Sequence, residues 1–349
     1  MLTAHDTAAV ITGIGSALPS RVVTNEELSS RLDTSDEWIR SRTGIRARHV
    51  IDPGMATSDL GVAAGEAALK SAEAPEVDAV LLATTTPDRP CPATAPDIAS
   101  RLGLGVVPAF DISAVCSGFV YGLAVGAGLV VGGVAGSVLV IGADTYSTIL
   151  NPEDRTTTPI FGDGAGAVVL RAGTAGELGA LGPFDLGSDG TLADLITIPA
   201  GGSRQRSSPD PVPDGDRYFQ MQGPKVFKNA VLRMAASARK VLARAGWELS
   251  DVDHLVAHQA NSRILAELAD QLGLSADRVV SNIANVGNAS AASIPLALVD
   301  AAQAGQLRSG QRVLLTAFGG GLTWGSTVLC WPDIQAVSQL PETSPGVAQ

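Results

Sequence analysis

Two stretches of sequence decide the fold: VDAVLLAT at residues 77–84 and VDHLVAHQ at residues 252–259. Each is a short apolar run of the kind found in buried strands, and the two begin 175 residues apart. The same offset relates VLVIGA at 138–143 to VLLTAF at 313–318. A single match is weak evidence, whereas two matches at one offset indicate that the chain contains a duplicated half.

Helical and strand-like patterns alternate along each half. This order predicts an α/β fold of layered sheets and helices, with mostly parallel central strands. Gly-rich turns follow the strand expected at 167–170, so we expect one half at residues 1–178 and the other at residues 179–349. The polar segment 199–216 is expected to form an exposed loop, and the tail from Pro332 to be loosely held.

Composition limits the class of protein. The chain has 349 residues, of which 45% are hydrophobic, and a net charge of −11, which fits a packed globular protein without a nucleic-acid partner. Its longest apolar stretch, 119–131, is too short to span a membrane. Cys91, Cys116 and Cys330 lack paired spacing and the start of the chain lacks a secretory pattern, so we expect a cytoplasmic protein without disulfides or metal.

Cys116 stands at a junction between a strand and a helix, in the run FDISAVCSGF at residues 110–119. The strand-like stretch ends at Ser113 and an apolar, small-residue segment begins at Phe119, so Cys116 is expected to open a buried helix. The helix dipole and the unpaired N–H groups at that end favour the reactive thiolate. A lone Cys is more often a small buried hydrophobe, so its assignment as a nucleophile rests on two distant segments.

His258 and Asn288 supply those segments. His258 follows a predicted strand, at the end where ligands bind in layered α/β folds, and Asn288 lies in a turn before the helix expected at 293–303. Taken singly, the histidine is more often structural and the asparagine a helix cap. The 175-residue offset aligns Asn288 with Ser113, three residues before Cys116. The duplication therefore predicts that Cys116, His258 and Asn288 converge near a pseudo-twofold axis.

Glycine-rich loops complete the candidate site. Glycines 319–321 follow a predicted strand, where backbone amides can approach a ligand and, with the N–H of Cys116, form an oxyanion hole. A flexible turn is the alternative. The glycines within 162–166 and 13–15 do not complete a dinucleotide fingerprint, because a following helix and a suitably placed acid are missing.

Six short runs occur along the chain in a characteristic order. They are TSDEWI (34–39), RTGI (42–45), FGDGAGA (161–167), HQAN (258–261), GNASAAS (287–293) and FGGG (318–321). Together they resemble 3-oxoacyl-acyl-carrier-protein synthase III, also called β-ketoacyl-ACP synthase III, a family of condensing enzymes. The resemblance covers about residues 10 to 331. It implies a thiolase-like fold, layered αβαβα from two duplicated halves, and no cofactor, since acyl-CoA and the malonyl carrier are substrates.

The resemblance also implies a reaction. Cys116 would attack an acyl-CoA thioester, and the N–H groups of Cys116 and Gly320 would hold the oxyanion. His258 and Asn288 would then stabilise the enolate formed when malonyl-acyl-carrier-protein loses CO₂, and the carbanion would attack the acyl-Cys116 carbonyl. This ping-pong, decarboxylative Claisen condensation would start fatty-acid synthesis.

Four residues match the coenzyme A site of the family. Trp38 and Arg155 would sandwich the adenine, Arg42 would lie near the phosphates, and Asn261 would contact the pantetheine arm. Without the resemblance, Trp38 reads as a partly buried structural aromatic and Arg155 as a solvated surface charge.

Lys228 and Arg263 are expected to dock the acidic acyl carrier protein. The chain departs from the family at Asp270 and Gln271, where members often carry Lys or Arg. The strength of docking, and even which carrier is used, is therefore left open.

Cys91 and Phe318 are expected to line the acyl pocket. Cys91 matches a position where some members place a bulky aromatic across the interface of a homodimer. The smaller side chain would admit longer or branched acyl groups, unless neighbouring side chains fill the space.

Other functions fit the sequence less closely. One alternative is a related synthase of polyketide or secondary metabolism, with a different primer, extender or acceptor, and another is a catalytically silent partner subunit. A degradative thiolase needs a second catalytic Cys, whereas Cys330 reads as part of a terminal strand. A cysteine hydrolase of the α/β-hydrolase type lacks the first Gly of its elbow at Ala114 and an acid between Cys116 and His258.

Overall fold

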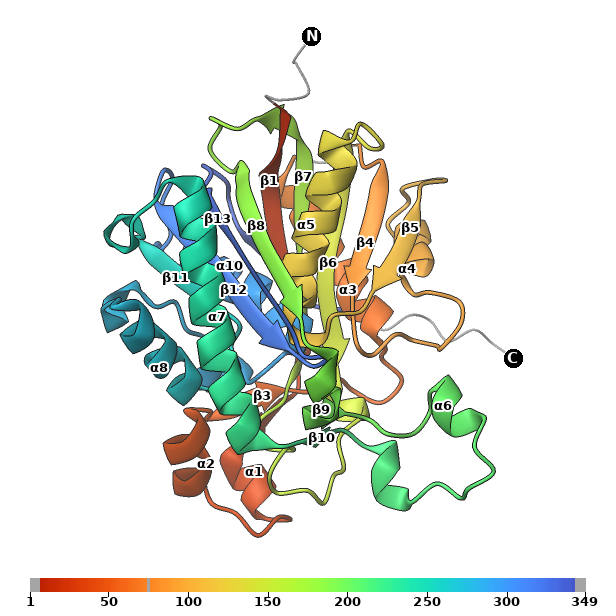
Figure 1. Ribbon diagram of the computed structural model, residues 1–349. Coiled ribbons are helices and arrows are strands. Elements are labelled where there is room, and N and C mark those ends of the chain that lie inside the picture. The colour runs from red at the N-terminus through yellow and green to blue at the C-terminus, as the bar shows by residue number, and fades with distance from the viewer. Residues whose placement is uncertain (1–6, 74–75, 343–349) are drawn as a thin grey trace.

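The computed structural model describes residues 7–73 and 76–342, which form two main sheets with helices between and around them (Figure 1). The strands are β1 (Thr7–Ala17), β2 (Val22–Thr24), β3 (Ala47–His49), β4 (Ala79–Ala83), β5 (Ala109–Ile112), β6 (Ser137–Thr145), β7 (Asp163–Thr174), β8 (Leu181–Ser188), β9 (Ile196–Thr197), β10 (Gln220–Met221), β11 (His254–Ala257), β12 (Arg312–Gly319), β13 (Thr323–Cys330) and β14 (Val337–Gln339). The α-helices are α1 (Asn25–Ser29), α2 (Asp36–Thr43), α3 (Thr57–Ser71), α4 (Ala95–Arg101), α5 (Gly118–Val131), α6 (Ser203–Arg206), α7 (Gly223–Ala245), α8 (Ser262–Leu272), α9 (Ile283–Val286) and α10 (Ser293–Gln303).

The two sheets repeat one topology. The first has the strand order β14-β1-β7-β6-β4-β5, and the second has the order β11-β12-β13-β8. In the first sheet β4 and β6 are parallel, and β7 is antiparallel to both β6 and β1. In the second sheet β11 and β12 are parallel, and β13 is antiparallel to both β12 and β8. The predicted duplication is therefore present in the strand order and in the strand directions.

The expectation of mostly parallel central strands is confirmed in strand direction, although each sheet is mixed: one strand of each, β7 in the first and β13 in the second, runs opposite to the others. A parallel neighbour requires a crossover connection, whereas a short turn suffices between antiparallel strands. Residues 320–322 join β12 directly to β13 and leave no room for a crossover helix.

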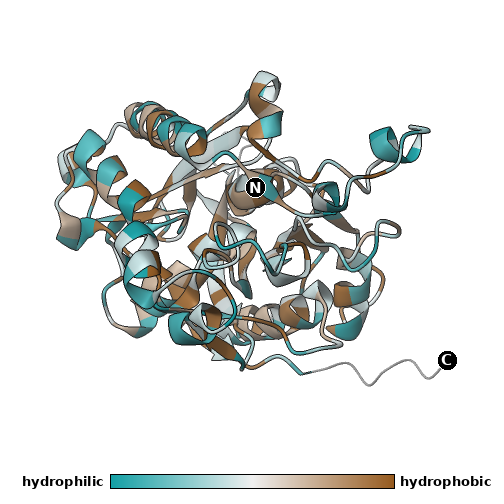
Figure 2. Ribbon diagram, turned by 90° about the horizontal axis from the view of Figure 1, so that it is seen from below, coloured by the Kyte–Doolittle hydropathy of each residue, from teal (hydrophilic) through white to brown (hydrophobic). Residues whose placement is uncertain are grey.

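Five layers follow from the packing of the helices. Helices α3 and α4 cover the outer face of the first sheet, and their side chains share a core with β4, β6 and β7. Helices α5 and α10 lie between the sheets, in a core that takes residues from both (Figure 1). Helices α7 and α8 cover the outer face of the second sheet. The layering αβαβα predicted from the resemblance is confirmed, and Figure 2 shows hydrophilic residues concentrated on the peripheral helices and loops.

The composition of α5 explains how a helix fits between two sheets. The helix reads GFVYGLAVGAGLVV and is apolar almost all round, as a helix enclosed on several sides should be. A Cβ at Gly122 or at Gly126 would lie 2.9 Å from the side chain of Val140 on β6. Glycine at these positions therefore allows the close approach of helix and sheet.

The tail from Pro332 differs from expectation, because its described part is ordered into the first sheet. Strand β14 pairs in parallel with β1, and the hydroxyls of Ser16 and Ser338 lie 3.0 Å apart. Pairing through the backbone needs no apolar pattern, so this strand could not be predicted from hydrophobic periodicity. The segment 199–216 is largely exposed, as expected, and projects from the body around α6 (Figure 1).

The chain passes from the first sheet to the second between Thr174, the last residue of β7, and Leu181, the first residue of β8. A division into halves 1–178 and 179–349 stays a prediction. Within residues 7–73 and 76–342, no helix has the length and apolar character that a membrane crossing requires.

Candidate active site

The candidate nucleophile lies in a strained turn. Cys116 is the middle residue of the 3-10 turn η1 (Val115–Ser117), directly before α5, so the expected place at the start of a buried helix is observed. Val115 has a φ of 47°. The duplicated half contains the same turn as η7 (Ser290–Ala292), directly before α10, and Ser290 has a φ of 50°. Left-handed backbone is uncommon at non-glycine residues such as these two, and residues in this conformation are found most often at functional sites.

One cavity of about 460 Å³ contains the predicted triad. Cys116, His258 and Asn288 all line it, although they come from three separate segments. Five other residues named from the sequence or the resemblance also line it or its mouth: Trp38, Arg42, Asn261, Arg263 and Phe318. Most of the remaining wall is apolar: Ile160, Phe161, Ile196, Phe219, Met221, Val226, Phe227, Met234 and Ile264.

His258 is held as a neutral imidazole. It follows β11, its backbone N–H donates to Thr316 at 2.9 Å, and its side chain is 2% exposed. Burial lowers the pKa of His258 to about 3. Its Nδ1 lies 2.6 Å from the hydroxyl of Ser293, the first residue of α10. Nε2 is therefore the nitrogen left to meet a ligand in the cavity.

Asn288 is fixed by hydrogen bonds on its backbone and on its side-chain oxygen. Its N–H donates to Ile160 at 2.9 Å, and its carbonyl accepts from Gly162 at 3.0 Å. Its Oδ1 accepts from the N–H of Ser290 at 2.9 Å. Because that oxygen is engaged, the amide can present its Nδ2 donor to a ligand.

The protonation state of Cys116 differs from expectation. The thiol is 8% exposed, and burial, the largest cause, raises its pKa to about 12. Desolvation of the thiolate thus outweighs the helix terminus that was expected to favour it. The resting site contains a neutral thiol and a neutral imidazole, so the thiol must lose its proton during the reaction.

The oxyanion-hole candidates lie where β12 meets the nucleophile turn. A Cβ at Gly319 would lie 2.7 Å from the backbone N of Cys116. The residue that corresponds to Gly319 in the first half is Asp144, whose Oδ2 accepts from the N–H of Ala291, the counterpart of Cys116. Glycine at 319 therefore leaves open, before the N–H of Cys116, the space that a carboxylate fills in the other half. Gly320 is buried beside Val115.

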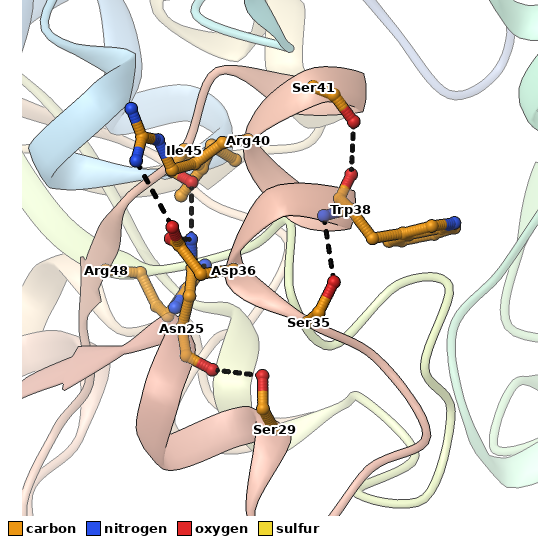
Figure 3. Close-up of polar contacts among 9 residues, drawn as sticks. All are labelled: Asn25, Ser29, Ser35, Asp36, Trp38, Arg40, Ser41, Ile45 and Arg48. Atoms are coloured by element: carbon orange, nitrogen blue, oxygen red, sulfur yellow. Dashed lines mark hydrogen bonds and ion pairs between the residues drawn. The ribbon is translucent and has the colours of Figure 1, made fainter.

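A polar network holds the helix that carries Trp38 (Figure 3). The buried guanidinium of Arg48 donates to Asn25 Oδ1 and to the carbonyl of Pro159, both at 2.7 Å. Asn25 donates in turn to Asp36 at 2.8 Å, and Arg40 donates to the same carboxylate at 3.2 Å. These bonds fix α1 and α2 to the wall of the cavity. The ring of Trp38 points away from the network (Figure 3).

The cation beside Trp38 is Arg42, whose guanidinium lies 5.3 Å from the ring centroid. The structure does not bring Arg155 to that ring. Instead Arg155 is exposed and pairs with Asp33 at 3.2 Å. An adenine sandwich with Arg155 would require this exposed pair to open, which costs little.

The remaining predicted residues divide between the mouth and the surface. Asn261 lines the cavity and also caps α8, accepting from the N–H of Ile264 at 2.9 Å. Arg263 and Lys228 are exposed, and Lys228 does not line the cavity. Cys91 is exposed and lies outside the cavity wall formed by the described part of the chain.

Sequence reasoning missed three residues next to the triad: Asp144, Ser290 and Ser293. All three are at most 1% exposed. Ser290 and Ser293 belong to the run GNASAAS already noted for Asn288, and an Asp near the end of an apolar strand was a usable signal. Burial raises the pKa of Asp144 to about 6.

A thiol, an imidazole and an amide around a deep apolar cavity define a condensing acyltransferase of the thiolase fold. The family model of 3-oxoacyl-[acyl-carrier-protein] synthase III matches residues 110–190, and the model of its C terminal matches residues 242–331. The chain is 64% identical over 332 residues to β-ketoacyl-[acyl-carrier-protein] synthase III 3 of Streptomyces coelicolor, covering 95% of this chain and 99% of the relative. The chain therefore belongs to the 3-oxoacyl-acyl-carrier-protein synthase III family, as the six runs predicted.

Solved structures agree with this assignment. The 3-oxoacyl-(acyl carrier protein) synthase III of Pseudomonas aeruginosa PAO1 superposes with a TM-score of 0.88 at 54% identity, over 94% of this chain and 99% of that one. The priming β-ketosynthase of the R1128 polyketide pathway gives a TM-score of 0.87 at 34% identity, over 94% and 97% of the two chains.

Proposed function

We propose that the protein catalyses acyl-CoA-primed, decarboxylative condensation with malonyl-acyl-carrier-protein and so initiates fatty-acid synthesis. The observation that carries this proposal is the meeting of Cys116, His258 and Asn288 in one cavity. Membership of the synthase III family supports the same reaction.

In the first step, Cys116 attacks the thioester carbonyl of acyl-CoA, and CoA leaves. The backbone N–H groups of Cys116 and Gly320 stabilise the oxyanion. Support comes from Gly319, since a side chain there would occupy the space before the Cys116 N–H.

In the second step, His258 and Asn288 act on the malonyl thioester. The Ser293 hydroxyl, which accepts from the N–H of Gln259 at 3.4 Å, donates to His258 Nδ1. The proton of the neutral ring is then on Nε2, which donates with Asn288 Nδ2 to the thioester oxygen. Both donors stabilise the enolate formed as CO₂ leaves, and its carbon attacks acyl-Cys116.

Residues at the mouth hold the two thioester substrates. Trp38 and Arg42 stack on and pair with the nucleotide of CoA, with Arg155 on the other face of the adenine, and Asn261 contacts the pantetheine. Lys228 and Arg263 give the surface near the mouth positive charge for an acidic carrier protein. No bound cofactor is expected, and a cytoplasmic location stays a prediction from the sequence.

The working form is a homodimer joined along β5. This strand is an edge of the first sheet, and an exposed edge invites pairing with a second chain. Large apolar side chains are exposed on it and on neighbouring α5: Phe110, Val125 and Val131. In such a dimer, Cys91 would reach the partner's acyl pocket, as the family resemblance implies.

A synthase that primes a polyketide pathway is the second candidate. It is favoured by the structural match to the R1128 priming synthase and by the small side chain at Cys91. Steady-state assays with straight, branched and longer acyl-CoA primers separate the two. Condensation of acetyl-CoA or a short branched primer with malonyl-carrier supports the first function, and no product with any primer and malonyl-carrier contradicts it.

A further inference from the structure

Behind Cys116 lies a buried polar cluster that the proposed reaction does not use. It consists of Asp144 near the end of β6, Tyr146 in the following turn and Ser290 in η7, all of them fully buried. The hydroxyls of Tyr146 and Ser290 have no hydrogen-bond partner of normal geometry in the described part of the chain. Buried hydroxyls without partners are rare, and they call for a physical explanation.

The carboxylate of Asp144 has one oxygen with free acceptor capacity. Its Oδ1 accepts from Thr85 N at 2.7 Å and from the hydroxyls of Thr84 and Thr86, both at 3.2 Å. Its Oδ2 accepts only from the N–H of Ala291 at 3.0 Å, among the described residues. Ser290, the residue before Ala291, also lowers the pKa of Asp144 through its side chain, which puts its hydroxyl beside this carboxylate.

The same hydroxyl also lies close to the nucleophile. Turns η1 and η7 pack together, and a Cβ at Gly118 would lie 3.3 Å from the Cβ of Ala291. The Ser290 side chain lowers the pKa of Cys116, of Asp144 and of Tyr146, in opposition to burial, so its hydroxyl is within reach of all three groups. Its left-handed backbone is the means by which the side chain reaches this position.

We propose that Ser290 and Asp144 form a proton relay that removes the thiol proton of Cys116 during acylation and returns it when the acyl-Cys bond breaks. His258 is the competing acceptor. With Nδ1 bound by Ser293 and its pKa lowered to about 3, it is a weaker base than Asp144, whose pKa is raised to about 6. The use of the relay in acylation and condensation rests on the proposed function. The transfer of the thiol proton through Ser290 to Asp144 does not depend on which substrate the thiol attacks.

The protons taken up and released are balanced over acylation and condensation together. As Sγ bonds to the acyl carbon, the thiol proton passes to Ser290 Oγ, whose own proton passes to Asp144. The C–S bond to CoA breaks, and the CoA thiolate takes a proton from solvent. When the carbanion has attacked, the Cys116 thiolate leaves and regains the proton held on Asp144 through Ser290. One solvent proton is thus consumed for each CO₂ released.

Few other charges act on Asp144. The titratable groups on adjoining elements are Cys116 in η1, Tyr146 in η2 and Asp163 on β7. Asp163 is itself engaged by Ser147 and by the N–H of Ile51. The region after β4 contributes hydroxyls, and no Lys or Arg of the described residues forms an ion pair with Asp144.

The test is alkylation of Cys116 by iodoacetamide between pH 5 and 8, which requires no acyl-CoA. In the native protein the rate should rise through about pH 6 as Asp144 ionises and then level. Ser290→Gly suits the left-handed backbone and removes the hydroxyl, whereas Ser290→Ala removes the hydroxyl and keeps the strain. Both should react about 100-fold more slowly at pH 7, with a rate that rises steadily with hydroxide.

Ser326→Ala is the matched control, because it removes a fully buried serine hydroxyl that pairs with Thr316 in the second sheet and does not belong to the cluster. It should keep the native pH profile within about two-fold of the native rates. The relay is refuted by a native profile in folded Ser290→Gly, by equal slowing in Ser326→Ala, or by no measurable reaction of the native thiol. Asp144→Asn, where it folds, should lose the rise near pH 6. A native protein that is alkylated as described but not acylated by any acyl-CoA would contradict the proposed function and leave the relay standing.

Discussion

Substitution of Gly319 by Ala tests the oxyanion hole in the place where the structure is tightest. The new Cβ would lie 2.7 Å from Cys116 N, 3.0 Å from Ser117 N and 3.1 Å from the carbonyl of Ala114. All three are backbone atoms, so no side chain can rotate away. Ordinary contact begins at 3.4 Å, so the nucleophile turn must move by about 0.7 Å relative to β12.

A shift of this size is large for a catalytic hydrogen bond. Loss of one oxyanion donor costs about 10²- to 10³-fold in kcat, and a misplacement of about 1 Å costs about 10²-fold. We expect Gly319→Ala to slow acylation of Cys116 by about 100-fold or more. Overpacking should lower the free energy of unfolding by about 1 to 3 kcal/mol.

The assay is single-turnover acylation by acetyl-CoA, followed by mass spectrometry, with urea unfolding measured in parallel. Gly118→Ala is the control, because its Cβ would meet methyl groups of Ala83 and Ala291 at 3.1 and 3.3 Å rather than backbone. It should acylate within about five-fold of the native rate. A folded Gly319→Ala protein with native acylation would refute the assignment of the Cys116 N–H to the oxyanion hole.

Three further predictions concern the site and its supports. Ser293→Ala removes the partner of His258 Nδ1 and should slow condensation at least about 10-fold, while Cys116 is still acylated at the native rate. An assay that measures acylation and condensation separately checks this. Equal slowing of both steps would contradict the tautomer assigned to His258. Arg48→Met leaves the Asn25 oxygen and two buried carbonyls without a donor and should lower the free energy of unfolding, measured in urea, by about 2 to 4 kcal/mol. Arg40→Met, at an exposed ion pair, should change the same free energy by under about 1 kcal/mol. Equal effects of the two substitutions would refute the supporting role of Arg48. Burial lowers the pKa of His258 from 6.5 to about 3, so between these pH values the unfolded chain binds a proton that the native protein does not. The free energy of unfolding of the native protein, relative to that of His258→Gln, should therefore fall as pH drops below 6.5, with a slope of up to about 1.4 kcal/mol per pH unit. A difference independent of pH would contradict a neutral buried ring.

The sequence revealed the architecture because duplication leaves a fixed offset. The strands around Leu81 and Val256, 175 residues apart, identified the equivalent halves, and Cys116, His258 and Asn288 followed from the ends of those strands. Strand β14 was not predicted, because its position in the sheet depends on backbone pairing with β1 and not on an apolar pattern.

Features set by depth and side-chain direction could not be predicted. The protonation of Cys116 depends on how much water the folded chain excludes, which a helix-terminus argument does not contain. Arg155 turns to Asp33, which only the arrangement of two distant loops reveals. Asp144 and Ser290 lie 146 residues apart, and nothing in either local run marks them as neighbours.

The central claim is that Cys116 carries the acyl group from one substrate to the other. Brief exposure to acetyl-CoA, followed by peptide mass spectrometry, should place one acetyl group on Cys116, and malonyl-acyl-carrier-protein should then remove it as a 3-oxoacyl carrier product. An acetyl group on another residue, or a protein left unmodified by every acyl-CoA tried, would contradict the account and favour a catalytically silent subunit.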